Sequence, residues 1–226
     1  MISAVAFCPH PPLLVPQVAH GAAAELDDLR AACRTAIERA ASSAPQLVVI
    51  GAGERSAQYG PTARGSLAGY GVPIEIPLGS DEPGPVGLPL SLTIAAWLLR
   101  DVLGPDCGAV GYSVSARESQ PPLLDDTPVA LLVMGDGSAR RGRTAPGYLD
   151  ERAAGFDADV AAALASGRGD CLAIDGWLAG QLLAAGAPAW NAAGRLLRCR
   201  SFDAELLYDH APYGVGYFVA AWTGDG

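Results

Sequence analysis

Short apolar runs alternate with amphipathic stretches along the chain. Residues 2–7 (ISAVAF) predict a strand, which the following prolines would end because proline has no N–H to give to a ladder. In residues 22–41 apolar side chains recur at steps of three and four with charged ones between them, which predicts an amphipathic helix. Residues 46–53 (QLVVIGAG) form a continuous apolar run, typical of a strand buried on both faces.

The alternation continues to the end of the sequence. Residues 205–222 predict a turn at Ala211–Pro212 that runs into a strong strand. Strands that alternate with helices favour a layered α/β/α fold. The Gly/Pro-rich residues 79–89 are interpreted as a loop, so we expect a single domain over residues 1–226. Further strands are predicted at 72–76, 108–114 and 128–134, and further helices at 88–103, 149–165 and 170–186.

Composition narrows the class of protein. Half of the residues are hydrophobic (50%), but no apolar run approaches the roughly eighteen residues of a membrane helix, so we expect a soluble protein without a membrane partner. The N-terminus lacks the basic segment of a secretion signal, which favours a cytoplasmic location. A net charge of -9 would repel a phosphate backbone, so nucleic acid is not expected as a partner. The composition leaves a homodimer open.

Cysteine and glycine patterns exclude several other classes. The 5 cysteines contain no CxxC pair, so neither a disulfide framework nor a zinc knuckle is indicated. GAGERS at 51 and GDGSARRG at 135 lack the glycine spacing of nucleotide-binding loops. A serine hydrolase built on Ser138 stays a weak alternative. The acidic pairs Asp27–Asp28 and Asp125–Asp126 are interpreted as solvated surface.

Two of the 3 histidines stand in stiff turns next to predicted strands. His10 directly follows the first strand among prolines, which would fix it at the carboxyl edge of the sheet, where open α/β sheets bind ligands. His210 precedes Pro212 and the last strand. Two imidazoles and a carboxylate would make a facial triad for non-haem Fe(II). The alternative is that each histidine caps a turn or faces solvent, the interpretation we adopt for His20.

FCPHPPLLVP at residues 7–16, together with APYGVGYFVA at 211–220, resembles the class III extradiol ring-cleavage dioxygenases of the LigB superfamily, in the single-domain form related to the MEMO proteins. LVVIGAG at 47–53 and LLVMGDGSARR at 131–141 stand where that family has central strands. The resemblance implies a three-layer α/β/α sandwich with a mixed central sheet. It also implies Fe(II) held by two histidines and a glutamate, which splits a catechol ring beside one hydroxyl with O2.

The site residues that the resemblance implies depart from the family at several positions. His10 matches the first ligand histidine, whereas Gly53, followed by Glu54, stands at the second. His210, beside Asp209, stands where the family has its glutamate. Ala139 replaces the catalytic histidine, so no catalytic base is assigned. We therefore expect Fe(II) or Zn(II), or no metal at all; the candidate ligands are His10, Glu54, Asp209 and His210, and the candidate substrate contacts are Ser138, Arg140 and Tyr213.

Two functions follow from these residues. The first is a divergent metal-dependent oxidoreductase that acts on a catechol-like aromatic substrate with O2. The second is a catalytically degenerate relative that uses the same cleft to bind a small molecule or a partner protein. A well-formed pocket without converging metal ligands would favour the second function.

Overall fold

A seven-stranded mixed sheet forms the centre of the protein. The structure is a computed structural model and describes residues 1–117, 120–122, 124 and 127–224. The strand order is β3-β6-β2-β7-β1-β9-β8, in which β6, β2, β7 and β1 are parallel and β3, β9 and β8 each run antiparallel to a neighbour. The strands of this sheet are β1 (Ile2–Cys8), β2 (Gln46–Ala52), β3 (Ala57–Tyr59), β6 (Val110–Val114), β7 (Val129–Met134), β8 (Asp203–His210) and β9 (Tyr217–Thr223).

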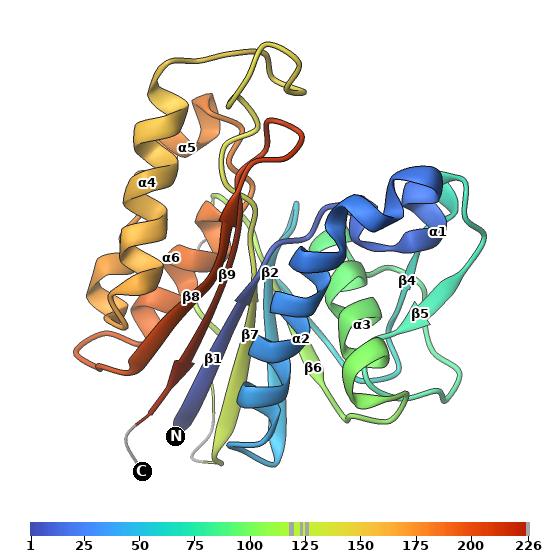
Figure 1. The fold of residues 1–226 in the computed structure, drawn as a ribbon. Coiled ribbons are helices and arrows are strands. Elements are labelled where there is room, and N and C mark those ends of the chain that lie inside the picture. Colours follow the sequence, from blue (N-terminus) through green and yellow to red (C-terminus); the bar gives the residue numbers. More distant parts are fainter. Residues whose placement is uncertain (118–119, 123, 125–126, 225–226) are drawn as a thin grey trace.

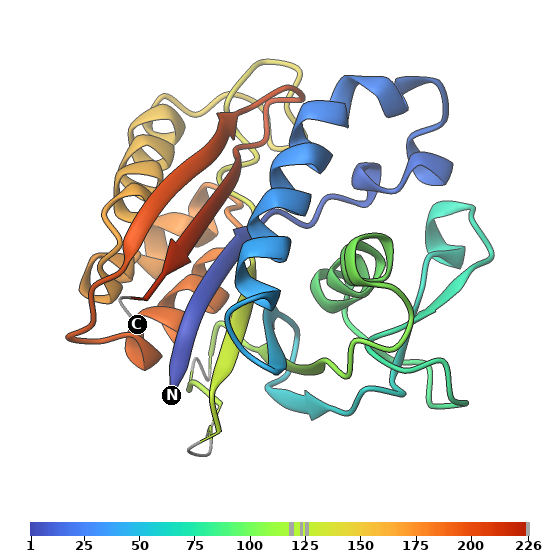
Figure 2. The same cartoon turned by 60° about the horizontal axis from the view of Figure 1, so that its bottom comes forward.

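Helices cover both faces of the sheet (Figures 1 and 2). One face carries α2 (Asp27–Ala41) and α3 (Leu90–Leu103). The other carries α4 (Arg152–Ala165), α5 (Gly176–Gln181) and α6 (Ala187–Leu196). The short elements are α1 (Pro16–Ala19), the 3-10 turns η1 (Pro12–Leu14), η2 (His20–Leu26), η3 (Ala68–Tyr70) and η4 (Gly169–Leu172), and a separate two-stranded sheet of β4 (Arg64–Ser66) and β5 (Glu75–Pro77).

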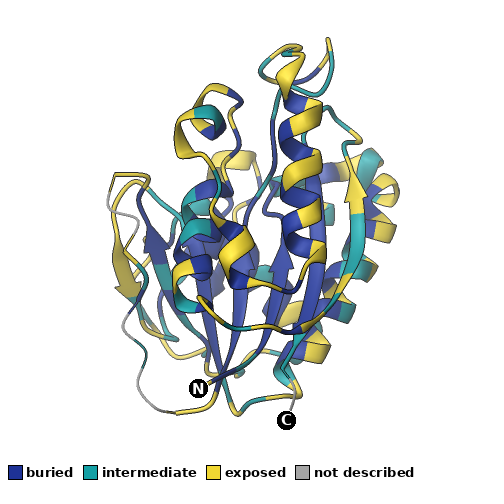
Figure 3. Ribbon diagram, turned by 90° about the vertical axis from the view of Figure 1, so that its left-hand side faces the viewer, coloured by how far each residue is buried: buried dark blue, intermediate teal, exposed yellow. Residues whose placement is uncertain are grey.

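The three-layer α/β/α fold is confirmed, and its layers follow from the apolar strands. Successive side chains of β1 point to opposite faces, so that Ala6 packs with the α2 and α3 layer and Phe7 with the α4 and α6 layer. Phe7 contacts Trp222, whose indole N–H donates to the Leu164 carbonyl at 2.6 Å. Buried strands consequently lie between helices that expose one side to solvent (Figure 3).

Several predicted elements differ from the observed ones. The predicted strand at 72–76 is instead β5, which pairs only with β4, outside the main sheet. The predicted helix at 170–186 is broken into η4 and α5, because Asp175 caps a new helix by accepting from the N–H groups of Trp177 and Leu178. The helix α6 was not predicted from the sequence.

The structure also bears on the predicted turn at His210, on the acidic pairs and on the expected lack of a membrane helix. His210 ends strand β8 and does not lie in the turn before the last strand. Asp27 and Asp28 are exposed at the start of α2, as predicted, whereas Asp125–Asp126 lies outside the described residues. Within the part of the chain that the structure describes, no helix has the length and apolar character of a transmembrane span.

The topology places a switch point between β1 and β7. These strands are parallel neighbours, with Cys8 opposite Met134 at their carboxyl ends. After β1 the chain passes to the face covered by α2, and after β7 it passes to the face covered by α4 (Figure 1). Where neighbouring strands send the chain to opposite faces, the strand ends are not covered by a connection, and α/β proteins bind their ligands there.

Candidate functional site

His10 and Asp136 meet at this switch point. Each lies two residues beyond the last paired residue of its strand, Cys8 in β1 and Met134 in β7. The backbone N–H of His10 donates to Asp136 Oδ1 at 2.7 Å, and the imidazole Nδ1 lies 3.5 Å from the same oxygen. His10 is only 6% exposed, because the prolines around it turn the chain across the sheet edge into the η1 turn. The predicted position of His10 at the carboxyl edge is confirmed.

Burial disfavours the charged form of the Asp136 carboxyl. Burial raises the pKa of Asp136, while the neighbouring His10 acts in the opposite direction. Tyr217, the first residue of β9, also has a raised pKa, mainly from burial and secondly from the Asp136 carboxylate. His10 Nδ1 is buried and has no hydrogen-bond partner among the described residues. A buried polar atom of this kind is where a water or a polar ligand group gains most by binding.

A cleft lies at the carboxyl ends of β2 and β6. Its volume is ≈ 660 Å³. Gly53 lines it and lies two residues beyond Gly51, which pairs with Met134 of β7, so the cleft adjoins the strand that carries Asp136. The polar side chains along the cleft are those of Glu54, Arg55, Ser56, Tyr59 and Ser113.

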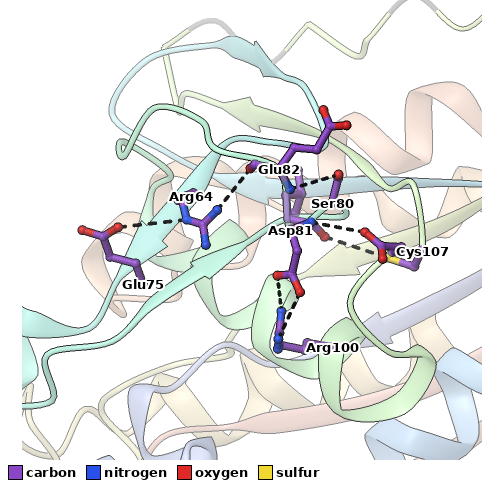
Figure 4. Close-up of polar contacts among 9 residues, drawn as sticks. Arg64, Glu75, Ser80, Asp81, Glu82, Arg100 and Cys107 are labelled. Carbon is purple, nitrogen blue, oxygen red and sulfur yellow. Dashed lines mark hydrogen bonds and ion pairs between the residues drawn. The ribbon is translucent and has the colours of Figure 1, made fainter.

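The loop of residues 79–89 brings Gly87 and Pro89 to the cleft and is anchored by polar contacts (Figure 4). Asp81 accepts two hydrogen bonds from the Arg100 guanidinium of α3, at 2.6 and 3.3 Å, which lower the pKa of that carboxyl. Arg64 donates to the Glu82 carbonyl at 3.2 Å. The cleft therefore has one wall from strand ends and one from a loop fixed to α3 and β4.

Position 53, which the resemblance aligns with a second ligand histidine, has no room for a side chain. A side chain at Gly53 would place its Cβ 2.8 Å from the Cβ of Ser113, closer than such atoms approach one another. Ser113 is itself held by a hydrogen bond to the Arg55 carbonyl at 2.6 Å. A histidine at position 53 would therefore require β6 to move or Ser113 to be replaced. Glu54, the next residue, is exposed at the cleft.

The predicted metal centre is not assembled. His210 and Asp209 are exposed at the end of β8, and the His210 ring contacts Tyr208 with centroids 5.0 Å apart. His210 lines a different, surface pocket of ≈ 590 Å³ with Glu25.

Strand order explains the separation. In the sheet, β2 and β8 are four places apart, with β7, β1 and β9 between them. At about 4.8 Å per place this is roughly 19 Å, whereas metal ligands lie about 2.0–2.2 Å from a shared ion. Glu54 and His210 therefore cannot bind one metal with His10. Among the described residues no group of three or more His, Cys, Asp or Glu could hold a metal ion, so the donor set fits neither Fe(II) nor Zn(II).

The predicted substrate contacts are also dispersed. Ser138 is fully buried; its hydroxyl donates to the Leu182 carbonyl at 2.9 Å and accepts from the Arg140 N–H at 3.1 Å. Its role is structural, which corrects the prediction that it contacts substrate. Arg140 is half-buried in the same loop. Tyr213 donates to Glu25 at 2.9 Å, on the side of the molecule where His210 lies. Ala139 donates its N–H to the Leu182 carbonyl.

Sequence reasoning missed two carboxylates, the partly buried Asp136 and the buried Asp157. Asp136 could have been found, since it follows the wholly apolar strand β7 in the GDGSA segment. Asp157 of α4 offered no signal, since it is one of two acids, with Asp159, in an alanine-rich helix. It accepts from the Ser138 N–H and from Arg141, both at 2.8 Å, and so ties the loop after β7 to α4.

Comparison with known proteins supports the fold and no function. No protein-family model matches the chain, and no curated protein matches it significantly. Among solved structures, the chain is similar to the crystal structure of uncharacterized protein JW3007 from Escherichia coli K12, with a TM-score of 0.51 and 13% sequence identity. The match covers 98% of this chain and 100% of the other, so the two proteins share the α/β architecture along nearly their whole length.

Proposed function

We propose that the protein binds a small, partly polar molecule in the cleft at the carboxyl ends of β2 and β6, with the His10–Asp136 pair at the ends of the next two strands, β7 and β1. In this proposal it is a relative of the extradiol dioxygenases that keeps the scaffold and binds without an iron centre. The single observation that carries the proposal is the buried His10–Asp136 pair at the switch point, on the strand end next to a formed cleft. Ligand sites of α/β proteins form at this place in the topology.

The dimensions and the lining of the cleft support a ligand of this kind. Its ≈ 660 Å³ lies within the range of about 300–1,000 Å³ that is usual for small-molecule sites. Hydroxyls of Ser56 and Tyr59, and the charged Glu54 and Arg55, offer both donors and acceptors. Pro89 and Leu90 give an apolar wall. This combination suits a cyclic or aromatic body that carries polar substituents.

The His10–Asp136 pair adds a titratable group at the neighbouring strand ends, beyond the residues that line the cleft. The Asp136 carboxylate accepts from the His10 backbone N–H and so holds the residue in place, while the imidazole Nδ1, 3.5 Å from the same oxygen, has no hydrogen-bond partner among the described residues. In this proposal Nδ1 is the imidazole atom that binds a polar group of the ligand. Ring cleavage would need metal ligands and a base, and Ala139 stands at the family's base position.

The proposal is tested by filling the cleft. An added Cβ at Gly87 meets no atom within 4 Å, so Gly87→Tyr places a ring at the cleft wall without a clash. Gly155→Tyr on the exposed side of α4 is the matched control, since it is equally free of contacts. A screen first selects small molecules that raise the melting temperature of the wild type. Isothermal titration calorimetry then measures the affinity of each selected molecule for the wild type, Gly87→Tyr, Gly155→Tyr and His10→Ala.

We expect the hits to lose affinity at least about tenfold in Gly87→Tyr and in His10→Ala, and to keep it in Gly155→Tyr. Hits that bind all variants equally would refute the proposed site. Metal analysis of untagged protein gives a second result: we expect no stoichiometric iron or zinc. Catechol turnover that requires added iron and is abolished by His10→Ala would favour the oxidoreductase over the binding protein.

A further inference from the structure

Large apolar side chains gather on the surface beside α5. Trp177 is 71% exposed, Tyr148 62%, Leu183 48% and Leu149 41%. We call these residues the α5 patch. Single exposed apolar residues are ordinary, whereas a group of them on one surface marks an interaction site.

The four side chains belong to connected elements. The loop of residues 139–149 is attached to the end of α5, because the Ala139 N–H donates to the Leu182 carbonyl. Within the loop, the Gly147 N–H donates to the Ala139 carbonyl. A Cβ at Gly147 would lie 2.7 Å from Leu183 Cδ1, so Leu183 packs against the residue before Tyr148. Figure 1 shows this loop arching over α5 and α4.

Trp177 is connected to the same surface through Gln181. The two residues are one helical turn apart on α5, at i and i+4. Arg152 donates to Gln181 Oε1 at 2.7 Å and to the Asp150 carboxylate at 2.7 Å, which links α5 to the chain next to Leu149. These contacts fix α5 to the loop that carries Tyr148 and Leu149, so the members of the α5 patch belong to connected elements.

Two members of the patch sit at strained backbone positions. Tyr148 has φ 59 and Leu183 has φ 55, in the left-handed region that favours glycine. A residue other than glycine in this backbone conformation destabilises the monomer. Because Tyr148 and Leu183 are exposed, their side chains make little packing contact that would offset this destabilisation. Backbone strain that the fold tolerates is concentrated at functional places. Burial against a second surface is the compensation that fits large apolar side chains.

The charges at the rim fit a second copy of this chain. Asp150 and Arg152 pair with each other, whereas Arg143 and Glu151 are exposed and form no ion pair among the described residues. One unpaired cation and one unpaired anion on the same rim become complementary when the surface meets itself about a twofold axis. We propose that two copies associate through the α5 patch, with Trp177 and Leu183 at the centre and Arg143 opposite Glu151 of the second copy. This inference does not depend on the proposed ligand.

Sedimentation velocity over a wide range of protein concentration tests the proposal. We expect a reversible dimer whose dissociation constant rises at least about tenfold in Trp177→Ser and in Leu183→Gly. Glycine suits the left-handed backbone at position 183, so loss of association in Leu183→Gly will not reflect unfolding, and its melting temperature checks this. Val86→Ser is the matched control, because Val86 is an exposed aliphatic residue (52%) in the distant 79–89 loop.

Charge reversal distinguishes this geometry from other ways to dimerise. Arg143→Glu and Glu151→Arg should each weaken the dimer, and the double variant should restore it, because the pair is re-formed with its signs exchanged. A wild type that stays monomeric at every concentration would overturn the proposal. A dimer that Trp177→Ser and Leu183→Gly leave intact would overturn it too, as would a charge-reversal pair without rescue.

Discussion

The hydrogen bond from the His10 backbone to Asp136 gives the sharpest test of the site geometry. Asp136→Ala removes the acceptor of a buried N–H at 2.7 Å, while Asp136→Asn keeps an oxygen at the same place. A buried donor without a partner costs about 1–3 kcal/mol. We therefore expect Asp136→Ala to lower the free energy of unfolding by that amount, and Asp136→Asn to stay within about 1 kcal/mol of the wild type.

Urea denaturation and calorimetry measure the two variants side by side. For a chain of 226 residues, about 1–3 kcal/mol corresponds to a melting temperature roughly 2–12 °C lower. Circular dichroism confirms that each variant keeps the fold. If Asp136→Asn were as unstable as Asp136→Ala, the stabilising interaction would be the charge and not the acceptor. If neither were destabilised, the bond to His10 would contribute nothing and the reasoning would be refuted.

The pH dependence of the same pair has a definite sign. Burial raises the pKa of Asp136 above its ordinary value of 3.8, so between that value and the folded pKa the native state binds more protons than the unfolded state. The stability contributed by Asp136 therefore falls as pH rises through this window and is largest below it. Asp136→Asn lacks this titration, so the stability of the wild type relative to Asp136→Asn should increase on acidification. The opposite slope would contradict the raised pKa.

Two further predictions use contacts elsewhere in the fold. Gly216→Ala would place a Cβ 2.3 Å from Asp157 Oδ2, so we expect overpacking to lower the free energy of unfolding by about 1–3 kcal/mol. Gly155→Ala on α4 meets no atom within 4 Å, so we expect it to raise the free energy of unfolding by about 0.5–1 kcal/mol. Thermal melting measures both variants. Iodoacetamide should label the exposed Cys171 and Cys199 in the native protein, and the buried thiols of β1 and α2 only after unfolding, with peptide mass spectrometry as the readout.

Local patterns predicted most of the sheet because its strands are apolar enough to be recognised alone. Residues 46–53 and 128–134 became β2 and β7 with nearly the predicted bounds. The predicted elements were wrong where the same residue type can either end or begin an element. The helix α6 carries Pro188 in its first turn, where proline is tolerated, so a residue that usually ends helices begins this one.

The candidate site was only half predictable. The prolines around His10 located it at the carboxyl edge, because a strand cannot continue through them. Its partner Asp136 depends on β7 lying next to β1, and the order of strands in a sheet is not the order in the sequence. The same limit explains why His210 and Glu54 were grouped with His10: each ends a strand at the same edge, but neither strand is a neighbour of β1.

The packing around Gly53 leaves no room for a side chain at this position. Restoring a ligand there would need a second change at Ser113, since their Cβ atoms would stand 2.8 Å apart. A ligand on β8 would still be separated from β1 by β9. The His10–Asp136 pair, by contrast, needs only that two parallel neighbours end at the same level, which the register of β1 and β7 guarantees. The topology therefore brings a buried imidazole and a partly buried carboxylate together at the carboxyl edge of the sheet, which is the arrangement that the proposed binding of a polar ligand uses.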